Sequence, residues 1–392
     1  MRFISPRPLL ILPRNSKSAI LSDLMVDSNA ISRRERTLGA LLGVHAGDSL
    51  GATLEFRSWK DIKNDYPRGL RDIVGGGMLN WPPGHATDDT DLTRAVLLAY
   101  RDAEELRRSQ PSECPDVVKL AAQYMVEWYH GRWPGRTPGQ TPRDIGGATA
   151  AAMSTLQRTN NPRASGAGEG RAGNGSLMRC IPTALFQPDA VKALTESLEI
   201  SAITHDDFNC TIACAAYNAM VRVLVDGGSA DEAWQVGKST AAELPSLAAA
   251  LGSAPTPVKK IELAARKVEA AIDAGKRLVQ LQDLAEKGPK NARNALEVLP
   301  LEGSGYVLES LTLAVAAMLD PRPLEDVLID VVRFGKDTDS NGAIAGGLLG
   351  ARDGVGAIPP RWRHLLQFGK EFTEVTDYLL SSTVTGEADD TT

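Results

Sequence analysis

Three aspartates and two threonines lie in one short segment, residues 84–91, which reads Gly-His-Ala-Thr-Asp-Asp-Thr-Asp and comes directly before an apolar helical pattern. Threonine and aspartate commonly cap a helix, because their side chains accept hydrogen bonds from free backbone N–H groups and a carboxylate suits the helix dipole. One such residue is enough for a cap. Adjacent carboxylates repel each other and need a positive charge nearby, so this segment could hold a cation as well as begin a helix.

A second segment, residues 335–342, reads Gly-Lys-Asp-Thr-Asp-Ser-Asn-Gly and precedes a helix of small residues. Each segment offers two carboxylates and a hydroxyl, and such hard oxygen ligands select Mg²⁺, Mn²⁺ or Ca²⁺ over zinc. Together the segments could hold two divalent ions ~3.5–4 Å apart and polarise the oxygens of a substrate. Taken singly, each segment is more often a cap. An EF-hand does not fit, because its glycine and final glutamate are misplaced.

Three further features could contribute to a site. Glu55 follows a glycine-flanked polar turn and could be a ligand or an acid–base group, although a glutamate on a surface loop is the simpler interpretation. Residues 166–179 are rich in glycine, which lets backbone N–H groups approach a phosphate, but they match neither a Walker A nor a Rossmann motif and could be a flexible loop. His205 could contact substrate or be a hydrogen-bonded structural histidine.

Helical spacing accounts for most of the chain. Apolar residues recur three or four positions apart, as at Leu311, Val315 and Met318, and alternating strand patterns are nearly absent. We therefore predict an all-α fold, a compact multi-helix bundle. Abundant glycine and alanine, with only 5% aromatic residues, predict close packing through small residues. The predicted helices span residues 36–50, 92–107, 117–129, 145–156, 190–202, 208–225, 230–244, 258–286, 306–318, 324–334 and 343–351.

The two ends of the chain differ from the rest. Residues 1–35 are basic at first, with no acid before Asp23, which indicates a disordered tail or a mitochondrial targeting segment. Residues 381–392 are polar and acidic and predict a flexible tail. Between them we predict a single domain over residues 36–380 with a helical insertion at about 245–300, whose charges form a solvated face.

Composition excludes several classes of protein. The 43 basic and 49 acidic residues give a net charge of −6, which argues against nucleic-acid binding through a broad basic face. No apolar run approaches the ~18–20 residues of a membrane span. The four cysteines form no CxxC pair, so disulfides and a zinc site are not expected and a reducing compartment fits. We expect a cytoplasmic protein, or a mitochondrial one if the basic tail is a targeting signal.

The order of these segments resembles the ADP-ribosylglycohydrolase family. The matching parts, in chain order, are residues 43–55, 84–91, 143–147, 173–179, 204–205, 305–307, 334–350, 358–359 and Trp362. Members of this family are compact all-α proteins with a binuclear Mg²⁺ or Mn²⁺ centre, and they cleave the bond between C1″ of ADP-ribose and an acceptor. The resemblance implies two divalent cations as cofactors, an ADP-ribosylated protein or ADP-ribose conjugate as substrate, and a monomer.

The resemblance also assigns residues. The implied metal ligands are Thr87, Asp88, Asp89, Asp337, Asp339 and Ser340, with Glu55 as a mobile extra ligand or gate; Ser340 is usually threonine in relatives and keeps the hydroxyl. The implied substrate-binding residues are Gly146, Gly173, Asn174, Gly175, Ser176, Met178 and His205. Asp144 matches an aspartate near the scissile bond of arginine-directed members, whereas Gly147 departs from those members that carry a polar residue there.

Within the family, residues 82–90 and 173–179 and the Asp-Ile-Gly at 144–146 favour the dinitrogenase reductase-activating type, which removes ADP-ribose from arginine. Cleavage through an oxocarbenium-like state would use Asp144 as acid–base group, with Asp88 or Asp339 holding the attacking water and Glu55 nearby. The main alternative is hydrolysis of O-linked ADP-ribose, as in ADP-ribosyl-serine, O-acetyl-ADP-ribose or poly-ADP-ribose. A non-catalytic crystallin-like relative fits less well, because all six implied metal ligands are present. A metal-dependent phosphohydrolase also fits less well, because such enzymes usually show His-Asp pairs and only residues 205–206 form one.

Overall fold

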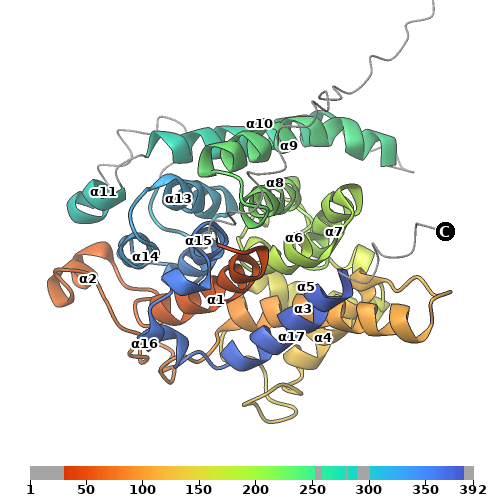
Figure 1. Ribbon diagram of the computed structural model, residues 1–392, viewed down its shortest axis with the longest axis horizontal. Helices are drawn as coiled ribbons and strands as arrows, with labels where there is room; N and C mark the ends of the chain where they lie inside the picture. Colours follow the sequence, from red (N-terminus) through yellow and green to blue (C-terminus); the bar gives the residue numbers. More distant parts are fainter. Residues whose placement is uncertain (1–30, 252–257, 279–280, 289–300, 384–392) are drawn as a thin grey trace, which may run out of the picture. The chain divides into compact units, whose positions relative to one another are not determined.

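The computed structural model describes residues 31–251, 258–278, 281–288 and 301–383. Within these ranges the chain is α-helical, with three short 3₁₀ turns and three isolated β-bridges but no longer strand, so the predicted all-α class is confirmed (Figure 1). The predicted tails lie largely outside the described residues, apart from their inner ends, which belong to helices. The same holds for residues 252–257, 279–280 and 289–300 of the predicted insertion.

Two helices packed through glycine occupy the middle of the fold (Figure 1): α1 (Arg33–Gly51) and α15 (Thr338–Asp353). Glycines recur every four residues on their facing sides. A Cβ atom added to Gly43 would lie 2.1 Å from the carbonyl oxygen of Gly346, and one added to Gly47 would lie 2.0 Å from that of Gly342. The helices run antiparallel at backbone contact, as the predicted packing through small residues required. The C-terminal end of α1 therefore meets the N-terminal end of α15.

The helix that follows the first acidic segment is α3 (Asp88–Ser109), and the Thr87 hydroxyl caps it by accepting a hydrogen bond from the Asp89 N–H. α4 (Val117–Tyr129) packs against α3, and α17 (Gly369–Thr383) covers α1 and α3. An ion pair between Arg94 and Glu371, 2.7 Å long, joins α3 to α17. α17 is the longest helix that the periodicity missed. The shorter ones are α2 (Trp59–Asp65), α6 (Ile181–Phe186) and α16 (Pro360–Arg363).

The remaining helices complete the bundle: α5 (Gly147–Thr159), α7 (Ala190–Ala202), α8 (Phe208–Val225), α9 (Ala230–Leu251), α10 (Val258–Arg277), α11 (Leu281–Lys287), α13 (Val307–Leu319) and α14 (Leu324–Val332). The stretch predicted as one helix over 258–286 forms α10 and α11 instead. α10 turns an apolar face toward α13 and α9 and exposes its charges, as predicted.

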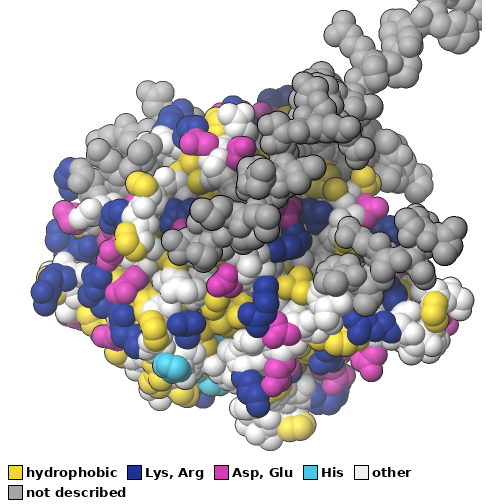
Figure 2. Space-filling model, in the orientation of Figure 1, with side chains coloured by type: hydrophobic (Ala, Val, Ile, Leu, Met, Phe, Trp, Pro, Cys, Tyr) yellow, Lys and Arg dark blue, Asp and Glu magenta, His cyan; other side chains and the backbone are white. Residues whose placement is uncertain are grey.

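One described helix, α8, is long and apolar enough to cross a membrane, which the sequence had not led us to expect. However, 72% of this helix is buried inside the protein, as in the core helix of a globular domain. On the face drawn in Figure 2, basic and acidic side chains are interspersed over the described surface rather than gathered by sign.

Candidate metal centre and substrate cavity

A cavity of about 320 Å³ opens where α3 and α15 begin and α1 ends. It brings together most of the residues predicted for the site, although they are spread over almost three hundred positions. Those that line the cavity are Glu55, Asp88, Asp144, Gly146, Gly173, Asn174, Gly175, Met178, His205, Asp337, Asp339 and Ser340. Thr87, Asp89 and Ser176 are buried and are not among the lining residues.

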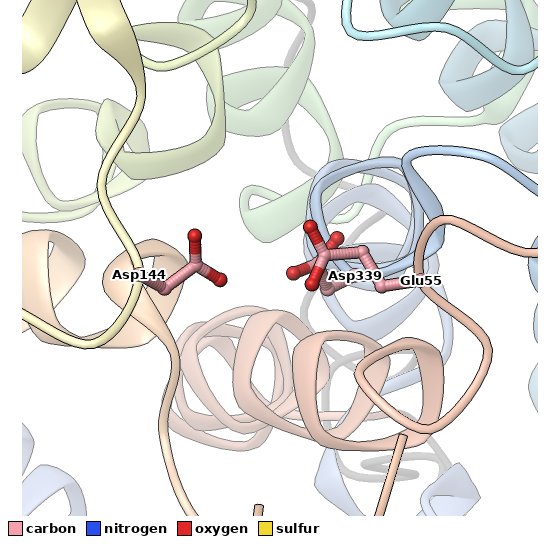
Figure 3. Close-up of side chains that lie close together, drawn as sticks. All are labelled: Glu55, Asp144 and Asp339. Atoms are coloured by element: carbon pink, nitrogen blue, oxygen red, sulfur yellow. The ribbon is translucent and has the colours of Figure 1, made fainter. Parts of the chain in front are cut away.

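Two loops that run side by side place Glu55 against the second acidic segment. The Phe56 N–H donates to the carbonyl of Lys336 at 2.6 Å, and the Lys336 N–H donates to that of Arg57 at 2.8 Å. As a result, Glu55, Asp144 and Asp339 each have a carboxylate oxygen within 4.8 Å of the others. Figure 3 shows Glu55 and Asp339 together on one side of a gap and Asp144 facing them from the other.

Asp89 joins the two acidic segments. Its Oδ2 accepts hydrogen bonds from the Thr87 hydroxyl at 3.0 Å and from the Ser340 hydroxyl at 3.3 Å. The hydroxyl groups predicted as ligands from both segments therefore meet at one carboxylate. This contact fixes the start of α3 against the start of α15.

Asp48, which the sequence reasoning did not select, holds the first acidic segment in place. Its Oδ2 accepts hydrogen bonds from the N–H groups of Thr87 at 3.1 Å and Thr90 at 3.2 Å, and also from the Thr90 hydroxyl. Burial raises the pKa of Asp48 to about 7 in spite of these bonds. A signal for it was available, since Asp48 is the one acid among the small and apolar residues at the end of the predicted helix 36–50.

The cavity is strongly acidic, and no lysine or arginine is among the described residues that line it. Burial, together with the charges of Asp144 and Asp337, raises the pKa of Glu55 to about 9. Burial and the charge of Asp337 raise the pKa of Asp144 to about 6. For Asp88 and Asp339, burial and neighbouring carboxylates hold the pKa well above its usual range. The charged forms of these groups therefore lack a positive partner within the cavity.

Several buried carboxylate oxygens have no hydrogen-bond partner among the described residues: Glu55 Oε2, Asp89 Oδ1, Asp144 Oδ2 and Asp339 Oδ1. A buried charge without a partner is costly, so such groups normally pair or coordinate a metal. The donors are carboxylates and hydroxyls without a thiolate, which fits a hard divalent cation such as Mg²⁺ or Mn²⁺. The arrangement therefore supports a metal site of buried acids.

The glycine-rich loop is tied to the second acidic segment through Asn174. Its Nδ2 donates to Asp337 Oδ2 at 2.6 Å and to the Ser310 hydroxyl at 3.0 Å, and its backbone N–H donates to the carbonyl of Gly305 at 2.9 Å. Gly175 lies against His205, where an added Cβ would be 2.8 Å from the ring. Only a residue without a side chain allows this loop to lie so close to the imidazole.

His205 is buried, and its Nδ1 lies 2.8 Å from the Thr204 hydroxyl. Burial and the charge of Arg179 lower the pKa of His205 to about 3, so the imidazole is neutral at pH 7. Arg179, also missed by the sequence reasoning, is fully buried and donates to the Gly175 carbonyl at 3.1 Å and the Thr204 hydroxyl at 2.6 Å. It supports the loop from beneath, while the Ser176 hydroxyl accepts from Ser201 rather than lining the cavity.

Comparisons with known proteins show which proteins this chain is similar to. A family model described as ADP-ribosylglycohydrolase matches residues 29–388. The chain is 28% identical over 331 residues to "ADP-ribosylarginine hydrolase Tri1" of Pseudomonas putida, covering 84% of this chain and 73% of that protein. It is 27% identical over 355 residues to "ADP-ribosyl-[dinitrogen reductase] glycohydrolase" of Rhodospirillum rubrum, covering 89% and 97%. A solved structure described as "ADP-ribosylglycohydrolase-related protein complex" is 27% identical with a TM-score of 0.61, covering 89% and 98%.

Proposed function

Because the chain belongs to the ADP-ribosylglycohydrolase family, we propose that it is a metal-dependent hydrolase that removes ADP-ribose from modified arginine side chains by cleaving the N-glycosidic bond. The observation that carries this proposal is the cavity in which Asp144 faces Glu55 and Asp339 (Figure 3). The choice of arginine is supported by the relative called an ADP-ribosylarginine hydrolase. The other relative, called an ADP-ribosyl-[dinitrogen reductase] glycohydrolase, supports a modified protein as substrate. The substrate is then an ADP-ribosylated protein or a conjugate of the same kind.

The residues that would hold divalent cations are Glu55, Asp88, Asp89, Asp337 and Asp339, with the hydroxyls of Thr87 and Ser340. Bound there, Mg²⁺ or Mn²⁺ would supply Lewis acidity and fix the hydroxyl groups of the sugar. The chain offers these ions unpartnered, buried oxygens. The loop 173–175 and the neutral His205 would line the path of the ADP-ribose away from the acids.

Asp144 is suited to move a proton at the leaving group. Its pKa, raised by burial to about 6, lets a fraction of the molecules carry a proton on this carboxyl near neutral pH. The protonated Asp144 donates to the leaving guanidine nitrogen as the C1″–N bond breaks. Water adds to C1″, its proton passes to Asp88 or Asp339, and these carboxylates stabilise the oxocarbenium-like state.

The test is hydrolysis of ADP-ribosyl-arginine and ADP-ribosyl-serine peptides side by side, with Mg²⁺, with Mn²⁺ and with EDTA. We expect release of ADP-ribose from arginine that depends on metal and stops with EDTA. Release from serine alone would support the proposed metal centre but would show that the acceptor is serine instead of arginine. No release from either peptide, with metal still bound, would favour another ADP-ribose conjugate or a binding protein without activity.

A further inference from the structure

A second cavity of about 110 Å³ meets the first at Asp88 and Asp144, which line both. Its other walls come from Trp81 and His85, from Asp91 and Trp128, and from the loop over residues 135–143. We propose that this cavity is the acceptor subsite, which receives the modified side chain and selects a guanidinium group as a donor of hydrogen bonds. This inference rests on the proposed function and names the part of the molecule that recognises the acceptor side chain.

His85 presents a hydrogen-bond acceptor to this cavity. Its Nδ1 lies 2.7 Å from the carbonyl oxygen of Ala86, and because a carbonyl only accepts, Nδ1 carries the hydrogen. Nε2 therefore keeps its lone pair, and it has no hydrogen-bond partner among the described residues. The ring is stacked on Trp81 at 5.0 Å between centroids, which holds its orientation.

Asp144 adds a second acceptor where the two cavities meet. Its Oδ2 is buried and has no partner among the residues that the structure describes. Asp88 also lines both cavities, but it belongs to the proposed metal centre. Asp91 is different, because Trp128 donates to one of its oxygens at 2.9 Å and Trp133 to the other at 2.7 Å. Asp91 is thus part of the wall, and the acceptors left for a ligand are His85 and Asp144.

Two arginines, Arg136 and Arg143, line this cavity, but neither donates a hydrogen bond to His85 or Asp144. Arg136 donates to the backbone carbonyls of Trp128 and Gln140. Arg143 donates to the carbonyls of Leu79 and Asn80, and its guanidinium lies 4.9 Å from the ring centroid of Trp81. Both cations are held by the backbone, so the acceptors remain available to an incoming group.

The chemistry of these walls fits arginine rather than serine. A guanidinium is planar and has no acceptor; it has five N–H donors in free arginine and four once one nitrogen carries the ribose. The cavity offers acceptors at His85 and Asp144, and Asp144 stands where the scissile bond would lie. A serine-linked substrate would bring one neutral oxygen to this position and leave the acceptors unpaired. At about one third of the larger cavity's volume, the space suits one side chain rather than a second nucleotide.

The experiment replaces His85 and compares two leaving groups on the same ADP-ribose: an arginine peptide and an α-linked p-nitrophenyl group, which has no N–H donor. We expect His85→Leu to lower kcat/KM for the arginine conjugate by about 10-fold to 100-fold, as for the loss of one hydrogen bond to a charged group. The value for the aryl conjugate should change less than about twofold. His85→Gln, which restores an acceptor, should recover most of the loss.

His130→Leu is the matched control, since His130 bonds to Gln157 and lines neither cavity. It should leave both substrates unaffected. An equal loss on both substrates in His85→Leu would show a structural role for His85 and overturn the inference while leaving the proposed function in place. An unchanged arginine rate would do the same. A wild-type protein that cleaves the aryl conjugate and never the arginine peptide would overturn the proposed acceptor and this subsite together.

Discussion

Two groups of buried carboxylates lie in this protein, and they differ in what surrounds them. In the first, Asp320 and Asp330 bind Arg322 at 2.7 and 2.8 Å, and Asp330 also binds Arg333 at 3.2 Å. We call this the arginine-paired cluster. In the second, which we call the open cluster, Glu55, Asp89, Asp144 and Asp339 keep oxygens that no described residue satisfies. One cluster is completed by its own chain, and the other needs a partner from outside.

This difference separates stability from function. Removing one partner of a buried, hydrogen-bonded ion pair strongly destabilises the folded protein. A buried carboxylate without a counter-charge lowers the stability of the native state, because its charge has lost its hydration. Removing such a carboxylate should therefore not destabilise the protein. Proteins retain such unfavourable sites where a ligand or a reaction uses them. The open cluster is therefore the part of the fold in which a substitution should abolish activity without loss of stability.

The largest effect should come from Asp339→Asn in the open cluster. This change keeps the size of the side chain and removes a charge on a proposed metal ligand. We expect hydrolysis of the ADP-ribosyl substrate to fall by at least about 100-fold, because a bound divalent cation contributes several kcal/mol of transition-state stabilisation and each ~1.4 kcal/mol is tenfold. At high pH, where the raised pKa of Asp339 still allows it to ionise, the metal-free variant should unfold at a higher temperature than the wild type, since one buried carboxylate without a positive partner is gone.

The two readouts are hydrolysis at saturating Mn²⁺ and thermal unfolding in EDTA. Full activity in a variant with unchanged metal content would remove Asp339 from the ligand set. A variant that loses activity because it unfolds earlier than the wild type would place Asp339 with the structural carboxylates and erase the contrast between the clusters.

A smaller effect, on stability instead of activity, should follow Asp330→Asn in the arginine-paired cluster. The substitution leaves Arg322 and the buried Arg333 without their shared carboxylate. We expect a loss of about 3 kcal/mol in the free energy of unfolding, at the lower end for a buried pair because Arg322 is partly exposed. The specific activity of the folded variant should be that of the wild type.

Urea unfolding followed by circular dichroism measures this loss, with Lys370→Gln as a matched control on an exposed ion pair worth less than ~1 kcal/mol. If Asp330→Asn were as stable as the wild type, the pairing with arginine would not explain why these carboxylates are buried. If it lost activity while remaining folded, the two clusters would be coupled.

Much of the site could be predicted from the sequence because its residues lie in short, polar segments at helix starts. The segments around Asp88 and Asp339 carry more charge than a helix cap needs, and this excess is visible without coordinates. The structure brings both to one cavity with Glu55 and Asp144. The all-α class followed in the same way from apolar spacing. Helix α17 was missed because its apolar residues are diluted by polar ones near the end of the chain.

The residues that sequence reasoning missed act through tertiary contacts. Asp48 accepts hydrogen bonds from residues about forty positions away, and Arg179 is buried beneath a loop that it supports. His85 lies in a segment that was selected, but its free ring nitrogen depends on the bond between Nδ1 and a backbone carbonyl. Composition and spacing carry no information about such pairings, because they arise only when distant parts of the chain meet.

The third prediction concerns the pH dependence of the metal-free protein. Folding raises the pKa of Glu55 to about 9 and that of Asp48 to about 7, both above the ~4 of the unfolded chain. The native state therefore binds more protons than the unfolded state between these values, and its stability falls as pH rises. Burial lowers the pKa of His45 to about 4 and that of His205 to about 3. These two shifts make stability rise with pH, but only up to the histidine pKa of the unfolded chain, ~6.5.

Asp48 and Asp91, whose pKa burial raises to about 7, complete their titration early in the window between pH 7 and 9, so this window mainly reports Glu55 of the open cluster. We expect the Tm measured in EDTA to fall by several degrees across this window, and added Mn²⁺ to raise it most at pH 9, where more carboxylates are ionised and the cation binds only the native state. Asp339→Asn should flatten the EDTA profile, whereas Asp330→Asn should lower it throughout and keep its slope. A Tm in EDTA that rose with pH would mean that the open cluster already has a positive partner, and the distinction between the two clusters would then be lost.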